Sequence, residues 1–252
     1  MVIYPFWKDV LAPLIEAAEA QHIVEVGALR GENTTRMLKD LPGQAELHVI
    51  DPAPAFDTGT PELSADKRYV FHRDLSLNVL PHLGAIDVAL IDGDHNWYTV
   101  YHELNILQDL AAERGTPLPV LVLHDVLWPH GRRDQYYNPA TIPEEYRKPY
   151  REYRVDGEVV CNAVEEGGPR NGVMCALKDF LSETGRSLRV VLIPIYHGLA
   201  IAVERDELAR KPRLLRFLDW LESAEGRFSL LKLSEEIRVR DLLLREVGKP
   251  RS

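Results

Sequence analysis

Short apolar runs alternate with amphipathic segments along the first half of the chain. Five runs rich in Val, Ile and Leu are expected to be β-strands: residues 22–27, 46–51, 68–74, 86–92 and 119–125. Four of them are continuously apolar, which is typical of parallel strands that are buried on both faces. Helical patterns separate several of these runs, most clearly at 96–114. The alternation predicts an α/β fold with helices on both faces of a doubly wound, mostly parallel sheet.

A β-hairpin and a helical tail are expected in the second half. Two apolar runs in residues 188–205 flank the tripeptide Tyr196-His197-Gly198, which is typical of a hairpin. Residues 207–248 follow as an amphipathic C-terminal helical extension, in which we expect two helices. The first 20 residues also show an amphipathic pattern, and they lack the basic head of a signal peptide. A further helix is therefore expected at the start of the chain.

An irregular insert at residues 127–172 separates the fifth strand from the hairpin. It is rich in Pro, Gly, Tyr and Arg. Loops of this length in a compact domain are usually functional or disordered, and five tyrosines argue against disorder. We expect the insert to be a lid on a single domain that spans residues 1–252, with a surface excursion of no function as the alternative.

Composition narrows the classes of partner. The net charge of −9 argues against nucleic acid, because phosphate binding needs clustered Lys and Arg. No apolar run approaches the ~18 residues that span a bilayer, so no membrane contact is expected. Two cysteines are too few for a disulfide framework, which favours a cytoplasmic location.

Carboxylates stand at or next to every predicted strand end, where open α/β sheets bind their ligands. The set is Glu25, Asp51, Asp74, Asp92, Asp94 and Asp125. A carboxylate at the end of a buried strand costs free energy unless something pairs with it, so the set favours a positively charged ligand. Helix capping or turn formation is the alternative for each residue taken alone.

The first strand-to-helix turn carries two glycines, Gly27 and Gly31, which allow close approach of a ligand to the backbone. Glu25 beside them would repel a pyrophosphate but suits an ammonium or sulfonium group. Asp51 follows Gly27 at about the offset of the acidic residue that binds ribose hydroxyls in nucleotide folds. A positively charged nucleoside fits this pattern better than a dinucleotide.

The segments "VEVGALRGENTT", "VIDPAP", "IDGDH" and "VLHDV" resemble the class I S-adenosylmethionine-dependent methyltransferases. Within that class they look like the small-molecule O-methyltransferase branch, which includes metal-dependent sugar and catechol O-methyltransferases. The resemblance covers residues 23–125 and, more loosely, the hairpin. It implies a Rossmann-like, seven-stranded sheet whose last strand is antiparallel. Leu29 departs from the family pattern, because many members have a glycine there.

By that resemblance the cofactor is S-adenosyl-L-methionine, and its binding residues are Glu25, Gly27, Gly31, Asp51, Asp74 and Asp92. The first three would line the methionine end, Asp51 would bind the ribose, and Asp74 would lie near the adenine. The acceptor would be a hydroxyl of a small molecule such as a sugar or natural product.

Removal of the hydroxyl proton requires either a divalent cation or a base near the sulfonium. Asp92, His124 and Asp125 are the candidate metal ligands, because Asp92 and Asp125 end adjacent strands. Mg²⁺ prefers oxygen ligands, so the imidazole of His124 shifts the preference toward Mn²⁺ or another transition ion. The candidate catalytic residues are Asp92, His95 and His124, with either histidine as the base if no metal is used. Asp94 is expected to cap the following helix.

The insert supplies candidates for binding the acceptor: Trp128, Arg132, Arg133, Tyr136 and Tyr137. The aromatic rings could stack on a ring of the acceptor and the arginines could hold an anionic group, with ordinary packing as the alternative. His130 is a further candidate ligand or base. The Leu-rich C-terminal helices suggest a homo-oligomer.

Two other functional hypotheses remain open at this point. One is a metal-dependent hydrolase or oxygenase that uses Asp92, His124 and Asp125 on the same sheet. The other is a non-catalytic module that binds a nucleoside.

Overall fold

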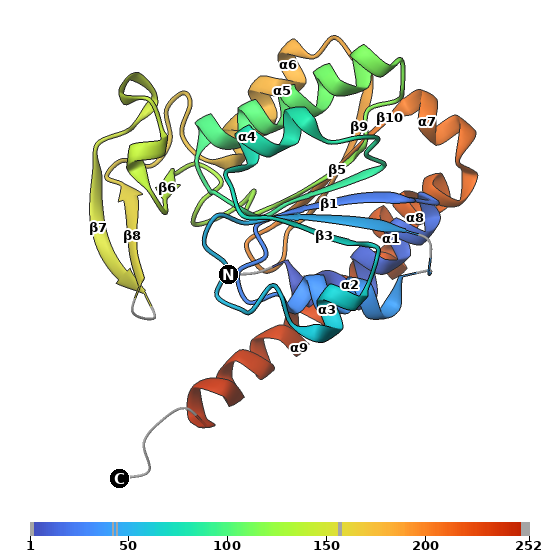
Figure 1. Cartoon of the computed structure of the whole chain (residues 1–252), viewed down its shortest axis with the longest axis horizontal. Helices are drawn as coiled ribbons and strands as arrows, with labels where there is room; N and C mark the ends of the chain where they lie inside the picture. The colour runs from blue at the N-terminus through green and yellow to red at the C-terminus, as the bar shows by residue number, and fades with distance from the viewer. Residues whose placement is uncertain (1–2, 42, 44, 156–157, 248–252) are drawn as a thin grey trace.

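A seven-stranded sheet lies at the centre of the chain in the computed structural model, which describes residues 3–41, 43, 45–155 and 158–247 (Figure 1). The strand order is β3-β2-β1-β4-β5-β10-β9. The strands are β1 (His22–Val26), β2 (Glu46–Ile50), β3 (Tyr69–His72), β4 (Val88–Ile91), β5 (Val120–His124), β9 (Leu188–Ile193) and β10 (Leu199–Glu204). All five expected strands and the hairpin are confirmed, with ends shifted by a few residues.

Strand direction also matches the prediction. Strands β1 to β5 pair in parallel, whereas β10 is antiparallel to both β5 and β9. The carboxyl ends of β1, β2, β4 and β5 therefore meet at one edge of the sheet, which places their terminal carboxylates side by side.

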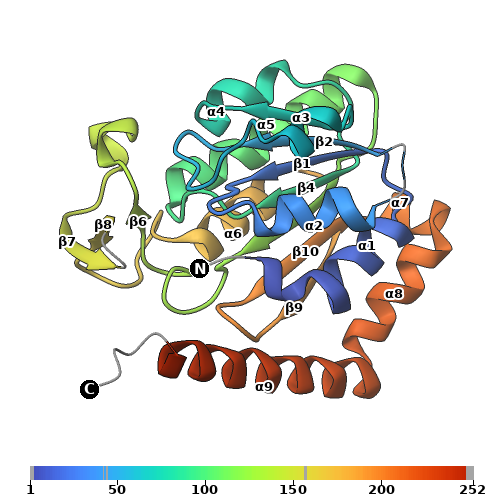
Figure 2. The same ribbon diagram turned by 60° about the horizontal axis from the view of Figure 1, so that its bottom comes forward.

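Helices cover both faces of the sheet (Figures 1 and 2). One face packs against α4 (Ser76–Val79), α5 (Trp97–Arg114) and α6 (Val173–Glu183). The other packs against α1 (Ala12–Ala17), α2 (Glu32–Asp40), α8 (Pro212–Glu222) and α9 (Ala224–Val247). Short helices complete the core domain: α3 (Pro61–Ala65), η3 (Leu80–His82) and α7 (Arg205–Arg210). The strands are buried on both faces, as their apolar runs predicted.

The N-terminal segment is not one regular helix, which corrects the expectation for residues 1–20. It consists of a 3₁₀ turn η1 (Tyr4–Phe6), a π turn η2 (Trp7–Leu11) and the short helix α1. Pro13 has no N–H to donate to the carbonyl of residue 9, and the N–H of Ala12 instead reaches Trp7 O, five residues back. The segment is deeply buried, with Phe6, Val10 and Leu11 inaccessible to solvent.

The insert is not irregular, contrary to the expectation for residues 127–172. It contains an antiparallel sheet in the order β6-β8-β7, formed by β6 (Gln135–Tyr136), β7 (Tyr150–Val155) and β8 (Glu158–Ala163). Two 3₁₀ turns, η4 (Pro139–Thr141) and η5 (Glu144–Tyr146), connect β6 to β7. Tyr136, Ile142 and Cys161 form a small core of its own. Figure 1 shows this sheet beside the main one, at the left of the view.

Three helices, not two, follow the hairpin. The proline at position 212 separates α7 from α8, because a proline cannot continue the hydrogen bonds of a preceding helix but is tolerated in a first turn. The last position of the expected extension, residue 248, lies outside the described residues. None of the helices within the described ranges combines the length and apolar character needed to cross a bilayer.

Candidate active site

The turn after β1 brings the backbone close to the end of β4. Gly27 has φ +86°, and a Cβ placed there would lie 2.3 Å from the carbonyl oxygen of Asp92. Gly31 also has positive φ, and a Cβ on it would lie 2.8 Å from the ring of Phe56. Both positions therefore require glycine for close packing as well as for conformation. Leu29, the departure from the family pattern, has φ +48° and a side chain that is 38% exposed.

Glu25 is buried below this turn. Its two carboxylate oxygens accept hydrogen bonds from Asn33 Nδ2 at 2.9 Å and Thr34 Oγ1 at 2.5 Å. Burial raises its pKa to about 7, although the two hydrogen bonds oppose the shift. Glu25 thus joins β1 to the first turn of α2 and contributes only partial negative charge at neutral pH.

Asp51 and Asp74 differ in exposure. Asp51 is 8% exposed, and its Oδ2 accepts hydrogen bonds from the N–H groups of Ala28 and Leu29 in the turn after β1. It therefore ties the end of β2 to the turn expected to hold the cofactor. Asp74 is exposed and accepts hydrogen bonds from Leu75 N and Asn78 Nδ2 at the start of α4.

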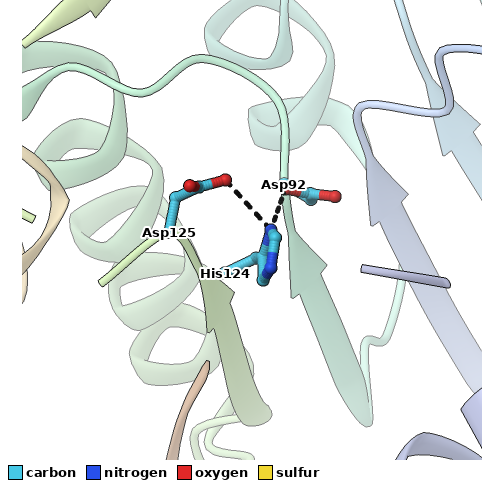
Figure 3. Close-up of side chains that lie close together, drawn as sticks. All are labelled: Asp92, His124 and Asp125. Carbon is cyan, nitrogen blue, oxygen red and sulfur yellow. Dashed lines mark hydrogen bonds and ion pairs between the residues drawn. The ribbon is translucent and has the colours of Figure 1, made fainter. Parts of the chain in front are cut away.

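Asp92, His124 and Asp125 converge at the ends of β4 and β5 (Figure 3). His124 Nδ1 lies 2.9 Å from Asp92 Oδ1 and 3.0 Å from Asp125 Oδ2. Side-chain exposure is 4% for Asp92 and zero for the other two. Asp125 has φ +56°, a left-handed conformation that aspartate adopts more readily than most residues. The three predicted ligands therefore share one site that is closed to solvent.

His95 lies against the same two carboxylates. Its Nε2 is 3.3 Å from Asp125 Oδ2 and 3.7 Å from Asp92 Oδ1. Asp94, one residue earlier, is not the helix cap that we expected. The cap of α5 is Asn96, whose side chain accepts a hydrogen bond from Thr99 N, while Asp94 Oδ1 accepts one from its neighbour His95 N.

The electrostatics of the cluster favour charged groups in the absence of a ligand. Burial by itself lowers the pKa of His124, but the attraction of Asp92 and Asp125 outweighs it and raises that pKa to about 10. Burial likewise opposes the charged form of His95, and the two carboxylates raise its pKa. The histidines in turn hold the pKa of Asp125 far below its usual range against the effect of burial.

Two backbone groups make hydrogen bonds to the cluster of Asp92, His124 and Asp125. The N–H of Ile3 donates to Asp92 Oδ2 at 2.7 Å, across 89 positions of sequence. His124 Nε2 lies 3.1 Å from the carbonyl oxygen of Tyr196, which can only accept a hydrogen bond. His124 Nε2 therefore carries a proton. The hairpin turn thus contributes to the site. The hydrogen bond from Ile3 to Asp92 could not be predicted from the sequence, because nearly every residue type supplies a backbone N–H.

The insert residues divide into two groups. Trp128 is 74% exposed, and Tyr137 is 48% exposed with its ring centroid 5.7 Å from that of His95. Tyr136 is fully buried within the insert, where its hydroxyl donates to Asp134 Oδ2 and accepts from Lys148 N. Trp128 and Tyr137 have surface available to an acceptor, and Tyr136 occupies a structural position.

The two arginines are also placed differently. Arg133 donates to the carbonyl groups of Ala163 and Val164 and pairs with Glu166 at 3.5 Å, so its guanidinium holds the insert together. Arg132 is exposed next to Gly167. His130 is buried and stacks on His95, with ring centroids 5.1 Å apart and planes 11° apart. Burial, with the nearby His95, lowers the pKa of His130 to about 3, so this ring is neutral.

The cluster fits a divalent cation on its own chemistry. Within the described part of the chain, both ring nitrogens of His95 and both carboxylate oxygens of Asp125 are buried without a hydrogen bond of good geometry, although Asp125 Oδ2 lies at ion-pair distance from both histidines. Buried polar atoms are rarely left in this state unless a ligand, ion or water satisfies them. Two carboxylates balance the charge of a divalent ion.

The family comparison covers the same part of the sheet. Residues 24–126 match a family model described as a methyltransferase domain. The match begins in β1 and ends one residue after Asp125, and so includes the cluster and both glycines. No curated protein shows significant sequence similarity to the chain.

Solved structures with a similar fold are distant in sequence. The SAH-bound methyltransferase PaMTH1 from Podospora anserina is 16% identical over 77% of each chain, with a TM-score of 0.47. The O-methyltransferase TomG from Streptomyces achromogenes, in complex with SAM, is 16% identical over 76% of each chain, with a TM-score of 0.45. A 1,6-didemethyltoxoflavin-N1-methyltransferase from Burkholderia thailandensis is 13% identical over 77% of this chain and 78% of that one, with a TM-score of 0.40. Similarity this distant does not extend to substrate or mechanism.

Proposed function

We propose that this chain is a class I S-adenosylmethionine-dependent methyltransferase that methylates a hydroxyl of a small molecule with the help of a divalent cation. The match of residues 24–126 to a methyltransferase family model supports the reaction class. The observation that carries the proposal is the buried group of Asp92, His124 and Asp125 at the carboxyl edge of the sheet. A hydroxyl is the acceptor whose deprotonation most needs such a site. The matched family supports methyl transfer over the two alternatives, a metal-dependent hydrolase or oxygenase and a non-catalytic nucleoside-binding module.

The cofactor side rests on the turn after β1. Asp51 would hold the ribose hydroxyls, since its carboxylate is fixed by two backbone hydrogen bonds at the edge of that turn. Gly27 and Gly31 keep the backbone free of side chains there, and Glu25 fixes the start of α2. Asp74 would contact the adenine from just before α4, where its carboxylate accepts hydrogen bonds from Leu75 N and Asn78 Nδ2. Fixed groups of this kind lower the entropic cost of binding.

The acceptor side rests on the cluster. Asp92, His124 and Asp125 would hold the cation, which when bound lowers the pKa of a coordinated hydroxyl and orients it. His124 keeps its Nε2 proton on the carbonyl of Tyr196, so Nδ1 is the nitrogen that faces the two carboxylates. The burial of these side chains excludes bulk water from the place where the proton is lost.

Trp128 and Tyr137 would flank the acceptor. Both are exposed aromatic side chains on the segment that follows β5, and the ring of Tyr137 lies next to His95. Large exposed aromatic residues are typical of surfaces that bind flat or ring-shaped molecules. A sugar or an aromatic natural product is the acceptor class that fits these two side chains, with Arg132 available for an anionic substituent.

Calorimetric binding of S-adenosylhomocysteine tests the cofactor site. We expect micromolar affinity for the chain as it is, and at least ~10-fold weaker binding for Asp51→Ala, because hydrogen bonds to a charged group each contribute roughly 1.5–3 kcal/mol. Asp51→Asn keeps an oxygen that can accept the hydrogen bonds from the N–H groups of the turn. Weaker binding by this variant would therefore reflect a lost contact with the ribose and not a disturbed turn. Asp57→Ala, an exposed aspartate in the next loop, is the control and should bind normally. Absence of binding by the unmodified protein would refute the cofactor assignment.

Metal removal tests the acceptor side. Treatment with a chelator should abolish methyl transfer to hydroxyl acceptors while leaving S-adenosylhomocysteine binding intact, and Mn²⁺ or Mg²⁺ should restore turnover. Full turnover in the presence of the chelator would reject the metal and leave His95 or His124 as the base.

A further inference from the structure

His95 is the member of the cluster whose role the three-residue metal site leaves unexplained. It is 3% exposed, and both of its ring nitrogens lack a hydrogen-bond partner among the described residues. The two carboxylates attract the charged form of the ring from 3.3 and 3.7 Å, but no aligned hydrogen bond replaces the hydration that its nitrogens lose on burial. A bound ligand that contacts His95 Nε2 would offset this loss of hydration.

The position of Nε2 indicates what that partner is. Asp92 Oδ1 lies 2.9 Å from His124 Nδ1 and 3.7 Å from His95 Nε2. Asp125 Oδ2 lies 3.0 Å from His124 Nδ1 and 3.3 Å from His95 Nε2. One oxygen from each carboxylate therefore faces one nitrogen from each imidazole. Ligands about 2.1 Å from a single ion lie roughly 3.0–3.4 Å from one another. Three of the four distances, 2.9, 3.0 and 3.3 Å, are close to this spacing, and His95 Nε2 would move a few tenths of an ångström toward Asp92 Oδ1 to reach it.

The orientation of both rings is fixed by neighbours outside the cluster. His124 places its Nε2 against the carbonyl of Tyr196, so its Nδ1 faces the two carboxylates, as Figure 3 shows. A bound ion would replace the proton on Nδ1. His95 stacks on the buried ring of His130. Imidazoles that bind metals are commonly oriented by such outer contacts.

We propose that His95 is a fourth protein ligand, so that the cluster binds a transition ion such as Mn²⁺, Fe²⁺, Co²⁺ or Zn²⁺ in preference to Mg²⁺. Two imidazole nitrogens and two carboxylate oxygens suit these ions, whereas Mg²⁺ selects oxygen ligands and keeps several waters. This inference rests on the proposed function for the presence of an ion. It adds a fourth ligand, which strengthens the preference for a transition ion that His124 alone already favours.

The test measures metal binding in the absence of both substrates. We expect the full chain, stripped with a chelator and dialysed, to bind one equivalent of Mn²⁺ or Co²⁺ by calorimetry, at least tenfold more tightly than Mg²⁺. His95→Gln should weaken Mn²⁺ and Co²⁺ binding at least tenfold and reduce the preference over Mg²⁺. His102→Gln is the matched control, because His102 lies on α5 with its Nδ1 2.7 Å from the carbonyl of Tyr98, and it should bind the ions normally.

Spectroscopy can count the imidazole ligands of the bound ion. The count shows whether His95→Gln removes a metal ligand or only disturbs the structure around the site. Nitrogen hyperfine coupling in the Mn²⁺ or Cu²⁺ form should indicate two imidazoles in the unmodified protein and one in His95→Gln. An unchanged count, or an unchanged preference over Mg²⁺, would overturn the proposal. Absence of any bound ion would overturn it as well. Retained S-adenosylhomocysteine binding in that case would show that the cofactor site is intact and that the cluster is a network of ion pairs.

Discussion

Among single residues, the buried acid Glu103 shows how strongly burial can change the pKa of a side chain. Glu103 lies within α5, where the helical pattern alone does not distinguish a solvated glutamate from a packed one. In the structure it is fully buried and accepts a hydrogen bond from Ser76 Oγ at 2.5 Å, and its second oxygen has no partner among the described residues. Burial raises its pKa to about 8, so the side chain is mostly protonated at neutral pH.

Glu103 should therefore make stability depend on pH. The unfolded chain loses this proton above the ordinary value of 4.5, and the folded chain keeps it until about pH 8. The folded state is the better proton binder between these limits, so the free energy of unfolding falls as pH rises from 4.5 to 8, by roughly a few kcal/mol. Chemical denaturation at a series of pH values should show this slope in the unmodified protein and a flatter profile in Glu103→Gln.

Glu113→Gln is the control for that series, because Glu113 is exposed on the same helix. It should leave the pH profile unchanged. A profile of Glu103→Gln that equals the unmodified one would show that Glu103 is not the residue responsible.

Single-residue roles were only partly predictable. Asp92 and Asp125 could be expected to converge, because they follow neighbouring parallel strands. Asp94 could not be separated from Asn96 as the cap of α5, since both are good capping residues next to the helix start. The burial of Tyr136 was hidden because its core belongs to a sheet that the sequence pattern did not reveal.

Among the structural elements, the insert contacts the core domain through a group of stacked aromatic side chains, which we call the aromatic contact. Tyr146, in η5, has its ring 5.9 Å from Trp97 and 4.9 Å from Tyr98, both at the start of α5. Arg170 lies over Trp97 at 5.0 Å and over Tyr146 at 5.6 Å. Stacking and cation–π contacts of this kind each contribute about 0.5–1.5 kcal/mol beyond burial. These contacts hold the insert against the start of α5.

Tyr146→Ala should loosen the insert without disturbing the cofactor site. We expect faster amide hydrogen exchange in β7 and β8, a higher KM for the acceptor, and a loss of about 1–3 kcal/mol in the free energy of unfolding. S-adenosylhomocysteine affinity should stay the same. Tyr153→Ala, on the exposed surface of β7, is the comparison and should show none of these effects. Unchanged amide hydrogen exchange in Tyr146→Ala would mean that the aromatic contact does not hold the insert in place.

At the scale of the whole molecule, the expected homo-oligomer stays a prediction. Helix α9 packs Leu230, Leu233 and Ile237 against the core, and Figure 1 shows its far end projecting beyond the rest of the chain. Among the described residues, its outer surface exposes five large apolar side chains: Phe228 at 72%, Leu231 at 65%, Val239 at 41%, Leu242 at 49% and Leu243 at 62%. Surfaces of this kind are typical of contacts between proteins.

A second copy of the chain is the partner that fits this helix. The ion-paired residues Glu235 and Arg238 lie between Leu231 and Leu242. In an antiparallel pair of α9 helices, Glu235 of each copy would face Arg238 of the other, and Leu231 would face Leu242. Sedimentation at micromolar concentration should show a dimer for the unmodified protein and a monomer for Leu231→Glu. Lys232→Glu, on an adjacent exposed position, should remain dimeric. A monomer at all concentrations for the unmodified chain would exclude the pairing.

The alternation of strands and helices, and the carboxylates at the strand ends, could be read from the order of residues alone. Both are local properties: apolar periodicity reports which side of a segment is buried, and a parallel sheet aligns the carboxyl ends of its strands. The same local patterns predicted the hairpin that supplies the antiparallel strand β10.

The contacts between distant residues became known only from the folded chain. Ile3 reaches Asp92 across 89 positions, His124 reaches the carbonyl of Tyr196 across 72, and His95 approaches a carboxylate from the next strand. Such contacts depend on how loops close and how rings are oriented by their neighbours, and the periodicity of a segment carries no information about its distant partners. The pairing of β6, β7 and β8 was hidden for the same reason, because short strands in a long insert are defined by their partners more than by their own pattern.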